Sequence, residues 1–154
     1  MNSHDTVNQY LRHFSEFIGA PLLKLNEQGV CAFSYQGRWQ VVLELPEAAT
    51  QLYFYAPLTE VPLEGRLAMY EQALKFNAYC VKTHGATLAL DPDAPRLLLC
   101  YVLPIEALNE VIFTNALNNF VQTLQELYEQ LKIQPDGEPN LLNNPDLQYW
   151  NQRV

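Results

Sequence analysis

The spacing of apolar residues in the middle of the chain most constrains the fold. Val30–Tyr35 and Trp39–Leu45 are short apolar stretches separated by Gln36-Gly37, a pair typical of a tight hairpin turn. Leu52–Ala56 adds a third stretch with three aromatic residues, which favour strands. We therefore expect a three-stranded antiparallel meander.

After the meander the spacing changes to that of a helix. From Leu63 to about Val81, apolar side chains recur every three or four residues. The expected stripe consists of Leu67, Tyr70, Ala73, Leu74, Asn77 and Val81. Such a stripe packs in the chain's own core or contacts a second molecule, and the sequence leaves both readings open.

Two further strands are expected after this helix. Ala86–Leu90 is the first, and the proline-containing segment Asp91–Pro95 predicts a rigid turn. Leu97–Leu103 is almost wholly apolar and does not alternate, which is typical of a strand buried on both faces.

A helix is expected at each end of this region. The first carries one continuous stripe and ends at Gly19; its members are Val7, Tyr10, Leu11, Phe14, Phe17 and Ile18. The last opens at Pro104 and Glu106, and its stripe is Leu108, Val111, Ile112, Leu117, Phe120, Val121, Leu124, Leu127, Tyr128 and Leu131. The predicted class is α+β, in the order helix, three-strand antiparallel meander, helix, two strands, helix.

The chain has 154 residues, which suits a single domain. We place that domain at 1–132, because proline and asparagine become frequent afterwards and predict a C-terminal tail at 133–154. The tail keeps apolar residues at Leu141, Leu142, Tyr149 and Trp150. Folding back, pairing with a neighbour and remaining unstructured are all left open.

The charge excludes some partners. Nine Lys and Arg against 17 Asp and Glu give a net charge of −8, and the basic residues are scattered. We expect neither nucleic acid nor an anionic membrane as a partner, since both require clustered positive charge.

The first twenty residues lack a signal-peptide pattern, and no apolar stretch is long enough to span a bilayer. We therefore expect a cytoplasmic protein.

No catalytic constellation is apparent. The three histidines are far apart, and Asp91 with Asp93 is best interpreted as a solvated turn. Cys31, Cys80 and Cys100 lie in apolar stretches, which predicts small buried hydrophobic side chains in a reducing compartment. We expect no enzyme activity, no catalytic residues, no metal and no cofactor.

Three stretches carry a family resemblance that extends from Thr6 to Leu131. They are IGAPLLKLNEQGVCAFSYQGRWQVVLEL (Ile18–Leu45), ALKFNAY (Ala73–Tyr79) and GATLALDPDAPRLLLCYVLP (Gly85–Pro104). Together they resemble the class I type III secretion chaperones of bacteria, the family of the Tir and Yop chaperones. The chain departs from that pattern at Lys75-Phe76 and in its long tail.

The resemblance implies a homodimer that binds the N-terminal chaperone-binding segment of a secreted effector as an extended polypeptide. It also implies delivery of that effector, kept soluble, to the secretion ATPase. Holding an extended segment needs exposed apolar side chains. Our candidates for the partner-binding surface are Tyr10, Phe14, Phe17, Ile18, Val41, Leu43, Tyr53 and Tyr55. Some of these must pack internally, and the sequence does not separate the two groups.

The implied dimer needs a contact surface of its own. The second helix and the two-sided strand are the candidates, since a strand apolar on both faces needs a second cover. The predicted interface residues are Leu67, Tyr70, Leu74, Val81, Leu97, Leu99 and Tyr101.

The main alternative is a module of the same fold that binds a small apolar ligand or a regulatory partner outside secretion. A closed internal pocket favours the ligand, whereas open apolar surfaces favour an extended peptide.

Overall fold

The order of elements follows the predicted one. The computed structural model describes residues 2–132. Its elements are α1 (Ser3–Ile18), β1 (Val30–Tyr35), β2 (Trp39–Glu44), β3 (Gln51–Glu60), α2 (Arg66–Asn77), β4 (Thr87–Leu90), β5 (Arg96–Pro104) and α3 (Glu110–Lys132), with 3₁₀ turns at Ala78–Cys80 and Ile105–Ala107. The α+β prediction is confirmed. The predicted tail at 133–154 lies outside the described residues, so the domain boundary at 132 stays a prediction.

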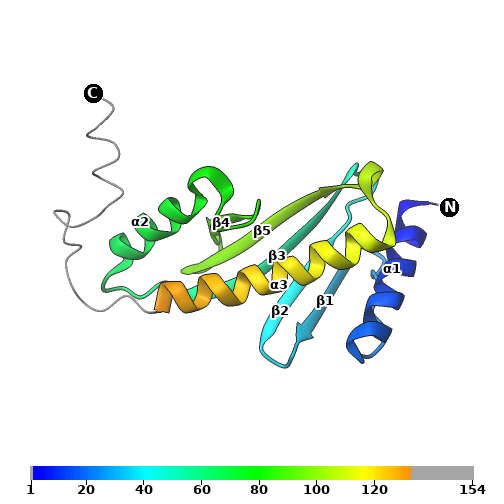
Figure 1. Ribbon diagram of the computed structural model, residues 1–154, viewed down its shortest axis with the longest axis horizontal. Coiled ribbons are helices and arrows are strands. Elements are labelled where there is room, and N and C mark those ends of the chain that lie inside the picture. Colours follow the sequence, from blue (N-terminus) through cyan, green and yellow to red (C-terminus); the bar gives the residue numbers. More distant parts are fainter. Residues whose placement is uncertain (1, 133–154) are drawn as a thin grey trace.

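The five strands form one antiparallel sheet in the order β1-β2-β3-β5-β4. β1, β2 and β3 make the expected meander, and β5 pairs with β3 from Gln51↔Pro104 to Glu60↔Arg96. β4 lies outside β5, so β1 and β4 are the two edges of the sheet (Figure 1).

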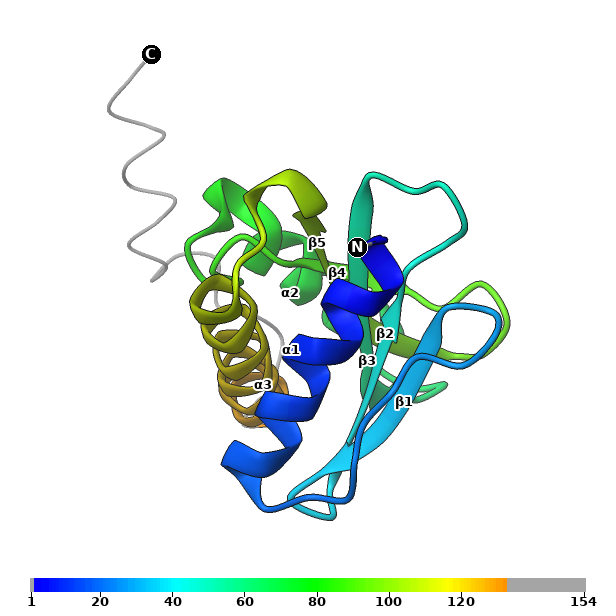
Figure 2. The same ribbon diagram turned by 90° about the vertical axis from the view of Figure 1, so that its right-hand side faces the viewer.

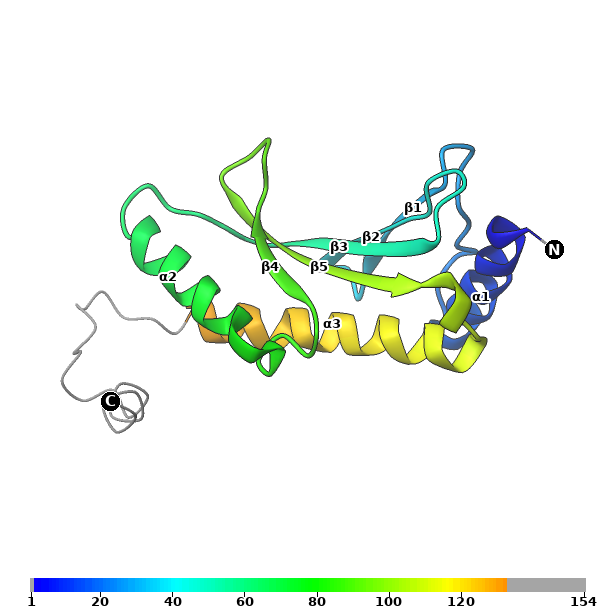
Figure 3. The ribbon, with the colours of Figure 1, turned by 90° about the horizontal axis from the view of Figure 1, so that it is seen from above.

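The helices α1 and α3 cover the same face of the sheet (Figure 2). α3 runs along the length of that face, and α2 lies at the β4 end (Figure 3). The main core forms beneath α1 and α3, where the Phe54 ring packs 6.0 Å from Phe120 and 6.3 Å from Phe113. Among the described residues, no helix covers the opposite face of the sheet.

The start of α3 differs from the prediction. The helix begins at Glu110 because the Asn109 side chain caps it, its Oδ1 accepting a hydrogen bond from the Ile112 amide at 2.9 Å. Val111 and Ile112 are exposed, although both were placed on the apolar stripe, and Phe113 is fully buried instead. Phe113 lies one helical turn before the buried Leu117, and its ring packs 5.7 Å from that of Tyr10 on α1.

The β1–β2 hairpin is fastened to the C-terminal half of α3. The predicted tight turn is present, with Gln36 (φ 52°) and Gly37 (φ 68°) in the left-handed region. The Arg38 guanidinium lies 4.6 Å from the Trp39 ring centre and 4.7 Å from that of Tyr128. Each cation–π contact contributes about 0.5–1 kcal/mol at an exposed site, so the hairpin and α3 hold a fixed relative position.

Gly29 allows the turn before β1 to touch the end of β2. Its φ is 77°, and a Cβ at this position would lie 2.1 Å from the carbonyl oxygen of Leu45. The same two residues share a backbone hydrogen bond from the Leu45 amide to the Gly29 carbonyl, at 2.8 Å. A side chain at Gly29 is therefore incompatible with the local backbone.

Within residues 2–132, no helix combines the length and apolar content that crossing a membrane requires.

We expect Gly29→Ala to lower the free energy of unfolding by at least about 2 kcal/mol, because both the φ value and the Leu45 carbonyl oppose a Cβ. Gly37→Ala is the matched control, since its φ is also positive but its Cβ would meet open space; it should cost about 1 kcal/mol. Urea unfolding measures both. Equal losses for the two variants would contradict the steric account.

Candidate binding surfaces

The C-terminal end of α1 presents apolar side chains to solvent. The helix ends at Gly19 in the left-handed conformation (φ 66°). In its last turn Phe17 is 72% exposed, and Ile18 is half-buried. Leu22, just beyond the helix, is also exposed. Tyr10, another predicted partner-binding residue, is half-buried against Phe113.

Three of the predicted partner-binding residues belong to the core, and the prediction is wrong for them. Phe14 is fully buried with its ring 6.3 Å from Phe33. Val41 and Leu43 are fully buried on the β2 face that α1 and α3 cover. Alternation along a strand tells which residues share a face, but not which face the helices occupy.

The helix-free face of the sheet is apolar and partly exposed. Tyr53 and Tyr55, both predicted partner-binding residues, are half-buried there. Their cross-strand neighbours are Glu44 and Val42 on β2, and Val102 and Cys100 on β5. Partial burial and the nearby Glu44 carboxylate raise the pKa of Tyr55, so its hydroxyl stays neutral and able to donate a hydrogen bond.

The helix α2 is apolar on two sides. Ala73 and Phe76 are buried against the sheet. On the other side Leu67 is 79% exposed and Leu74 is 71% exposed, and Tyr70 is half-buried. Leu63 before the helix, and Tyr79 and Val81 after it, are also exposed. Four predicted interface residues, Leu67, Tyr70, Leu74 and Val81, therefore remain accessible in the single chain.

The predicted interface is wrong for two residues of β5. Leu97 and Leu99 are buried on the inner face of the sheet, so this chain already covers them. Tyr101 lies on the same face, half-buried, with its ring 6.0 Å from Phe54. The outer face of β5 carries Val102, which is 42% exposed. The strand is thus covered fully on one face only, and not on both as expected.

Several exposed apolar residues were not predicted as site residues, and three of them, Leu22, Leu63 and Tyr79, lie close to the proposed surfaces on α1 and α2. All three lie just outside an α-helix, where the helical period gives no signal. Pro21 and Pro62, which precede the two leucines, mark connecting segments and were the available sign that these leucines lie at the surface.

Two of the three thiols are poorly suited to nucleophilic chemistry. Burial raises the pKa of the Cys31 thiol and of the Cys100 thiol, so the reactive thiolate is depleted at neutral pH. Cys80 is exposed and Cys100 is half-buried, so the expectation of three buried cysteines is correct for Cys31 alone. Among residues 2–132, no three His, Cys, Asp or Glu side chains are grouped as a metal site would require.

The hollow between α3 and the loop before β4 is small. It is lined by Thr83, His84, Ala86, Tyr101, Ala116, Asn119, Phe120 and Thr123, and has a volume of about 50 Å³. Pockets for small-molecule ligands measure about 300–1,000 Å³. The Nδ1 atom of His84 and the hydroxyl of Thr123 form a hydrogen bond of 2.9 Å at its wall. This hollow gives no support to an apolar ligand.

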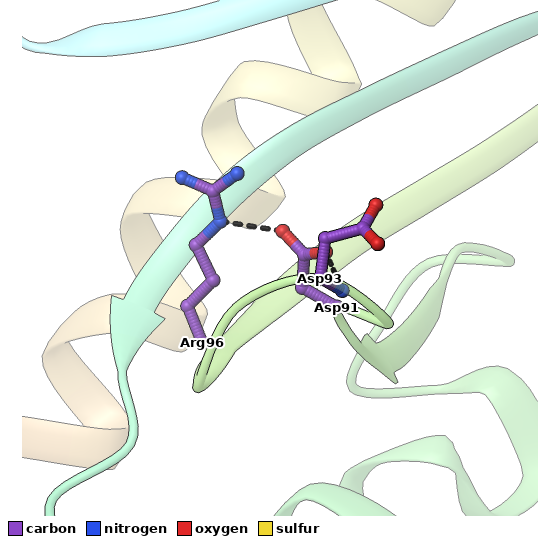
Figure 4. Close-up of polar contacts among 3 residues, drawn as sticks. All are labelled: Asp91, Asp93 and Arg96. Carbon is purple, nitrogen blue, oxygen red and sulfur yellow. Dashed lines mark hydrogen bonds and ion pairs between the residues drawn. The ribbon is translucent and has the colours of Figure 1, made fainter.

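The acidic pair at the β4–β5 turn is structural. Asp91 Oδ2 accepts a hydrogen bond from Arg96 Nε at 2.6 Å, and Asp91 Oδ1 accepts one from the Asp93 amide at 2.9 Å (Figure 4). The backbone hydrogen bond from Asp93 and the Arg96 side chain hold the pKa of Asp91 below its ordinary value. The carboxylate fixes the turn.

A family model covers most of this structure. The model of the Tir chaperone protein (CesT) family matches residues 9–128, which include the C-terminal part of α1, the entire sheet, α2 and most of α3. The chain belongs to the Tir chaperone protein (CesT) family. No curated protein matches the chain by sequence.

Solved structures share the CesT-family fold. A chain of the ExsC–ExsE complex has a TM-score of 0.72 at 21% identity, over 90% of this chain and all of that one. A chain of the HopA1–SchA chaperone–effector complex has a TM-score of 0.63 at 18% identity, over 84% and 94%. The type III secretion chaperone SycH of Yersinia pestis, in complex with a fragment of YscM2, has a TM-score of 0.59 at 24% identity, over 79% and 99%.

We expect Asp91→Asn to lower the urea midpoint at pH 7, because the charged carboxylate accepts the bonds that fix the turn. The lowered pKa means that this contribution is complete above the ordinary value of 3.8 and is lost as the pH falls through the native value. The difference in urea midpoint between wild type and Asp91→Asn should therefore become smaller below pH 3.8. Asp93→Asn is the control and should leave the midpoint nearly unchanged; an equal loss there would contradict the assignment.

Proposed function

We propose that this chain is a type III secretion chaperone, which binds the N-terminal segment of a secreted effector as an extended polypeptide and keeps it soluble and secretion-competent. Membership of the CesT family supports this function. The HopA1–SchA pair is described as a chaperone–effector complex, and SycH as a chaperone bound to a partner fragment. The proposed role needs no catalysis and no cofactor, and we place it in the bacterial cytoplasm.

The observation that carries the proposal is the exposure of large apolar side chains next to a complete core. Ordering one residue of an extended segment costs about 1–2 kcal/mol of backbone entropy. At about 25 cal/mol per Å², roughly 40–80 Å² of apolar surface must be buried per residue held, less what hydrogen bonds contribute. One aromatic side chain supplies about 150–250 Å². Phe17 is the most exposed of the candidates, and Tyr53 and Tyr55 lie on the open face of the sheet.

The edge strand β1 supports binding of an extended segment. Its Ala32 and Ser34 are exposed, and β1 has β2 as its single partner among the described strands. A polypeptide beside this edge gains main-chain hydrogen bonds in addition to side-chain burial. The proposed partner-binding surface therefore consists of Tyr10, Phe17, Ile18, Tyr53 and Tyr55, with the β1 edge.

We further propose a homodimer formed through α2. Leu67, Leu74 and Val81 are apolar and largely exposed, which is unfavourable in a protein that stays single. A second copy would cover them in both molecules at once, since a two-fold contact uses the same surface twice. The dimer thereby leaves α1 and its exposed Phe17 free.

The test uses as its probe the purified N-terminal segment of the protein encoded by the neighbouring open reading frame, once co-expression and pull-down with this chain have identified it as the bound partner. We expect Phe17→Asp to leave the fold unchanged, because the side chain is exposed, and to weaken binding at least about 30-fold. That factor corresponds to about 2 kcal/mol of lost aromatic burial. Calorimetry measures the affinity, and circular dichroism the fold.

Gln9→Asp is the matched control for Phe17→Asp. It introduces the same carboxylate at an exposed polar position of α1. Its affinity should equal that of wild type. Unchanged binding by Phe17→Asp would remove the end of α1 from the partner-binding surface.

We expect Leu74→Asp to give single chains in solution, because a dimer through α2 would bury the new carboxylate without a partner. Multi-angle light scattering measures the mass. Leu22→Asp makes the same chemical change at an exposed leucine outside α2 and should keep the wild-type mass. A Leu74→Asp protein with the mass of two chains would exclude α2 from the interface.

A further inference from the structure

The two edges of the sheet do not present the same backbone groups. An edge strand leaves N–H and C=O groups pointing outward, where they can pair with a strand of another chain. In an antiparallel sheet the two backbone groups of a residue point the same way, and successive residues alternate. Each edge can therefore be examined residue by residue.

On β4, the outward groups of Leu88 are taken up by the side chain of Asn77. The Asn77 Oδ1 atom accepts a hydrogen bond from the Leu88 amide at 2.8 Å, and its Nδ2 atom donates one to the Leu88 carbonyl at 3.0 Å. The Asp91 amide donates to the Arg96 carbonyl of β5, so by alternation the backbone groups of Leu88 point away from β5. The Asn77 amide occupies the place that a neighbouring strand would take.

Little of the β4 edge remains after this contact. Because Leu88 points outward, Thr87 and Ala89 point toward β5, and Leu90 is the one other outward residue of the strand. Before β4, the Ala86 amide donates to the Thr83 carbonyl at 3.0 Å. A single free position is too short for strand pairing.

The β1 edge is closed at its first residue only. There the Val30 amide donates to Asn26 Oδ1 at 2.9 Å, and the Val30 carbonyl accepts from the Asn26 amide at 2.8 Å. By alternation Ala32 and Ser34 are the remaining outward residues, and both are exposed. The two edges thus differ in how many positions they leave open.

The chain around Asn77 is shaped to hold this contact. Asn77 is the last residue of α2, and Tyr79 (φ 60°) and Cys80 (φ 55°) follow it in the left-handed region. Such values are costly for residues other than glycine. They turn the chain away from the helix and back toward β4, as Figure 3 shows.

We propose that Asn77 closes the β4 edge of the sheet against pairing with the β4 strand of a second copy. An antiparallel pair of identical strands is two-fold symmetric. The β4 strand of a second copy can therefore pair with an open β4 edge, and other copies of the chain are the most abundant source of such a strand. Combined with any second contact surface, such pairing produces open-ended assemblies. The inference does not depend on the identity or existence of an effector.

Asn77→Leu in the full chain tests the proposal by two measurements. Amide hydrogen exchange should show the Leu88 amide exchanging about tenfold faster than in wild type, the factor expected for loss of one ordinary hydrogen bond. The Leu99 amide, which points toward β3, is the internal reference and should not change. Light scattering should show a mass that rises with concentration in the variant and stays constant in wild type.

The matched control is Asn115→Leu, which adds the same side chain at an exposed position of α3. It should keep the wild-type mass. If an added surface leucine by itself caused association, the mass of this control would rise as well. The double variant Asn77→Leu with Leu90→Lys should return to the wild-type mass, because a charge at the remaining outward position blocks pairing.

Three results would overturn the proposal. They are an unchanged Leu88 exchange rate, a constant mass despite faster exchange, and assemblies that persist in the double variant. If circular dichroism shows that Asn77→Leu does not fold, Asn77→Ala replaces it, because alanine removes the same two bonds without adding a bulky side chain. The same three results would then overturn the proposal. Effector binding is not read in either measurement, so a failure of the proposed function leaves this test unaffected.

Discussion

The structure depends on the packing of α3 against one face of the sheet. Phe54, in the central strand β3, lies within 6.3 Å of the rings of Phe113 and Phe120, and Tyr101 contacts it from β5. This contact buries the inner residues of β3 and β5 without help from another molecule. Since both long helices lie on that side, the outer face and α2 keep apolar side chains in contact with water. The surfaces proposed for partners follow from this one-sided burial.

The elements were predictable from sequence because apolar spacing reports local geometry. The Gln36-Gly37 turn and the meander are examples, since each depends on neighbours in the chain. The prediction of which face of an element is buried failed where contacts between distant elements decide that face. Val41 and Leu43 share a face with Trp39, yet only the position of α3 makes that face the interior. Phe113 was missed although it lies four residues before Leu117 and seven before Phe120, because the expected stripe began at Leu108 and placed Val111 and Ile112 on the buried side of the first turn.

Of the predicted partner-binding residues, Phe17 is the most exposed because it lies past the last buried residue of α1, and its role stays a prediction. The role of Asn77 was not predictable, since its two hydrogen bonds reach a residue eleven positions away. On the sequence it appeared as one member of an apolar stripe. Its side-chain amide instead forms hydrogen bonds with the backbone of Leu88 at the β4 edge. A polar residue within an apolar stripe can therefore mark a contact between two elements.

The exposure of Cys80 gives this protein a convenient chemical handle. The raised pKa values of Cys31 and Cys100 and the burial around them slow their alkylation, whereas Cys80 faces water beside the exposed Tyr79 and Val81. A maleimide dye would therefore react first at Cys80 of the single chain, without engineering, and more slowly where a second copy covers the end of α2. Its fluorescence would report on the end of α2, far from the α1 end of the molecule, and would follow events there in real time.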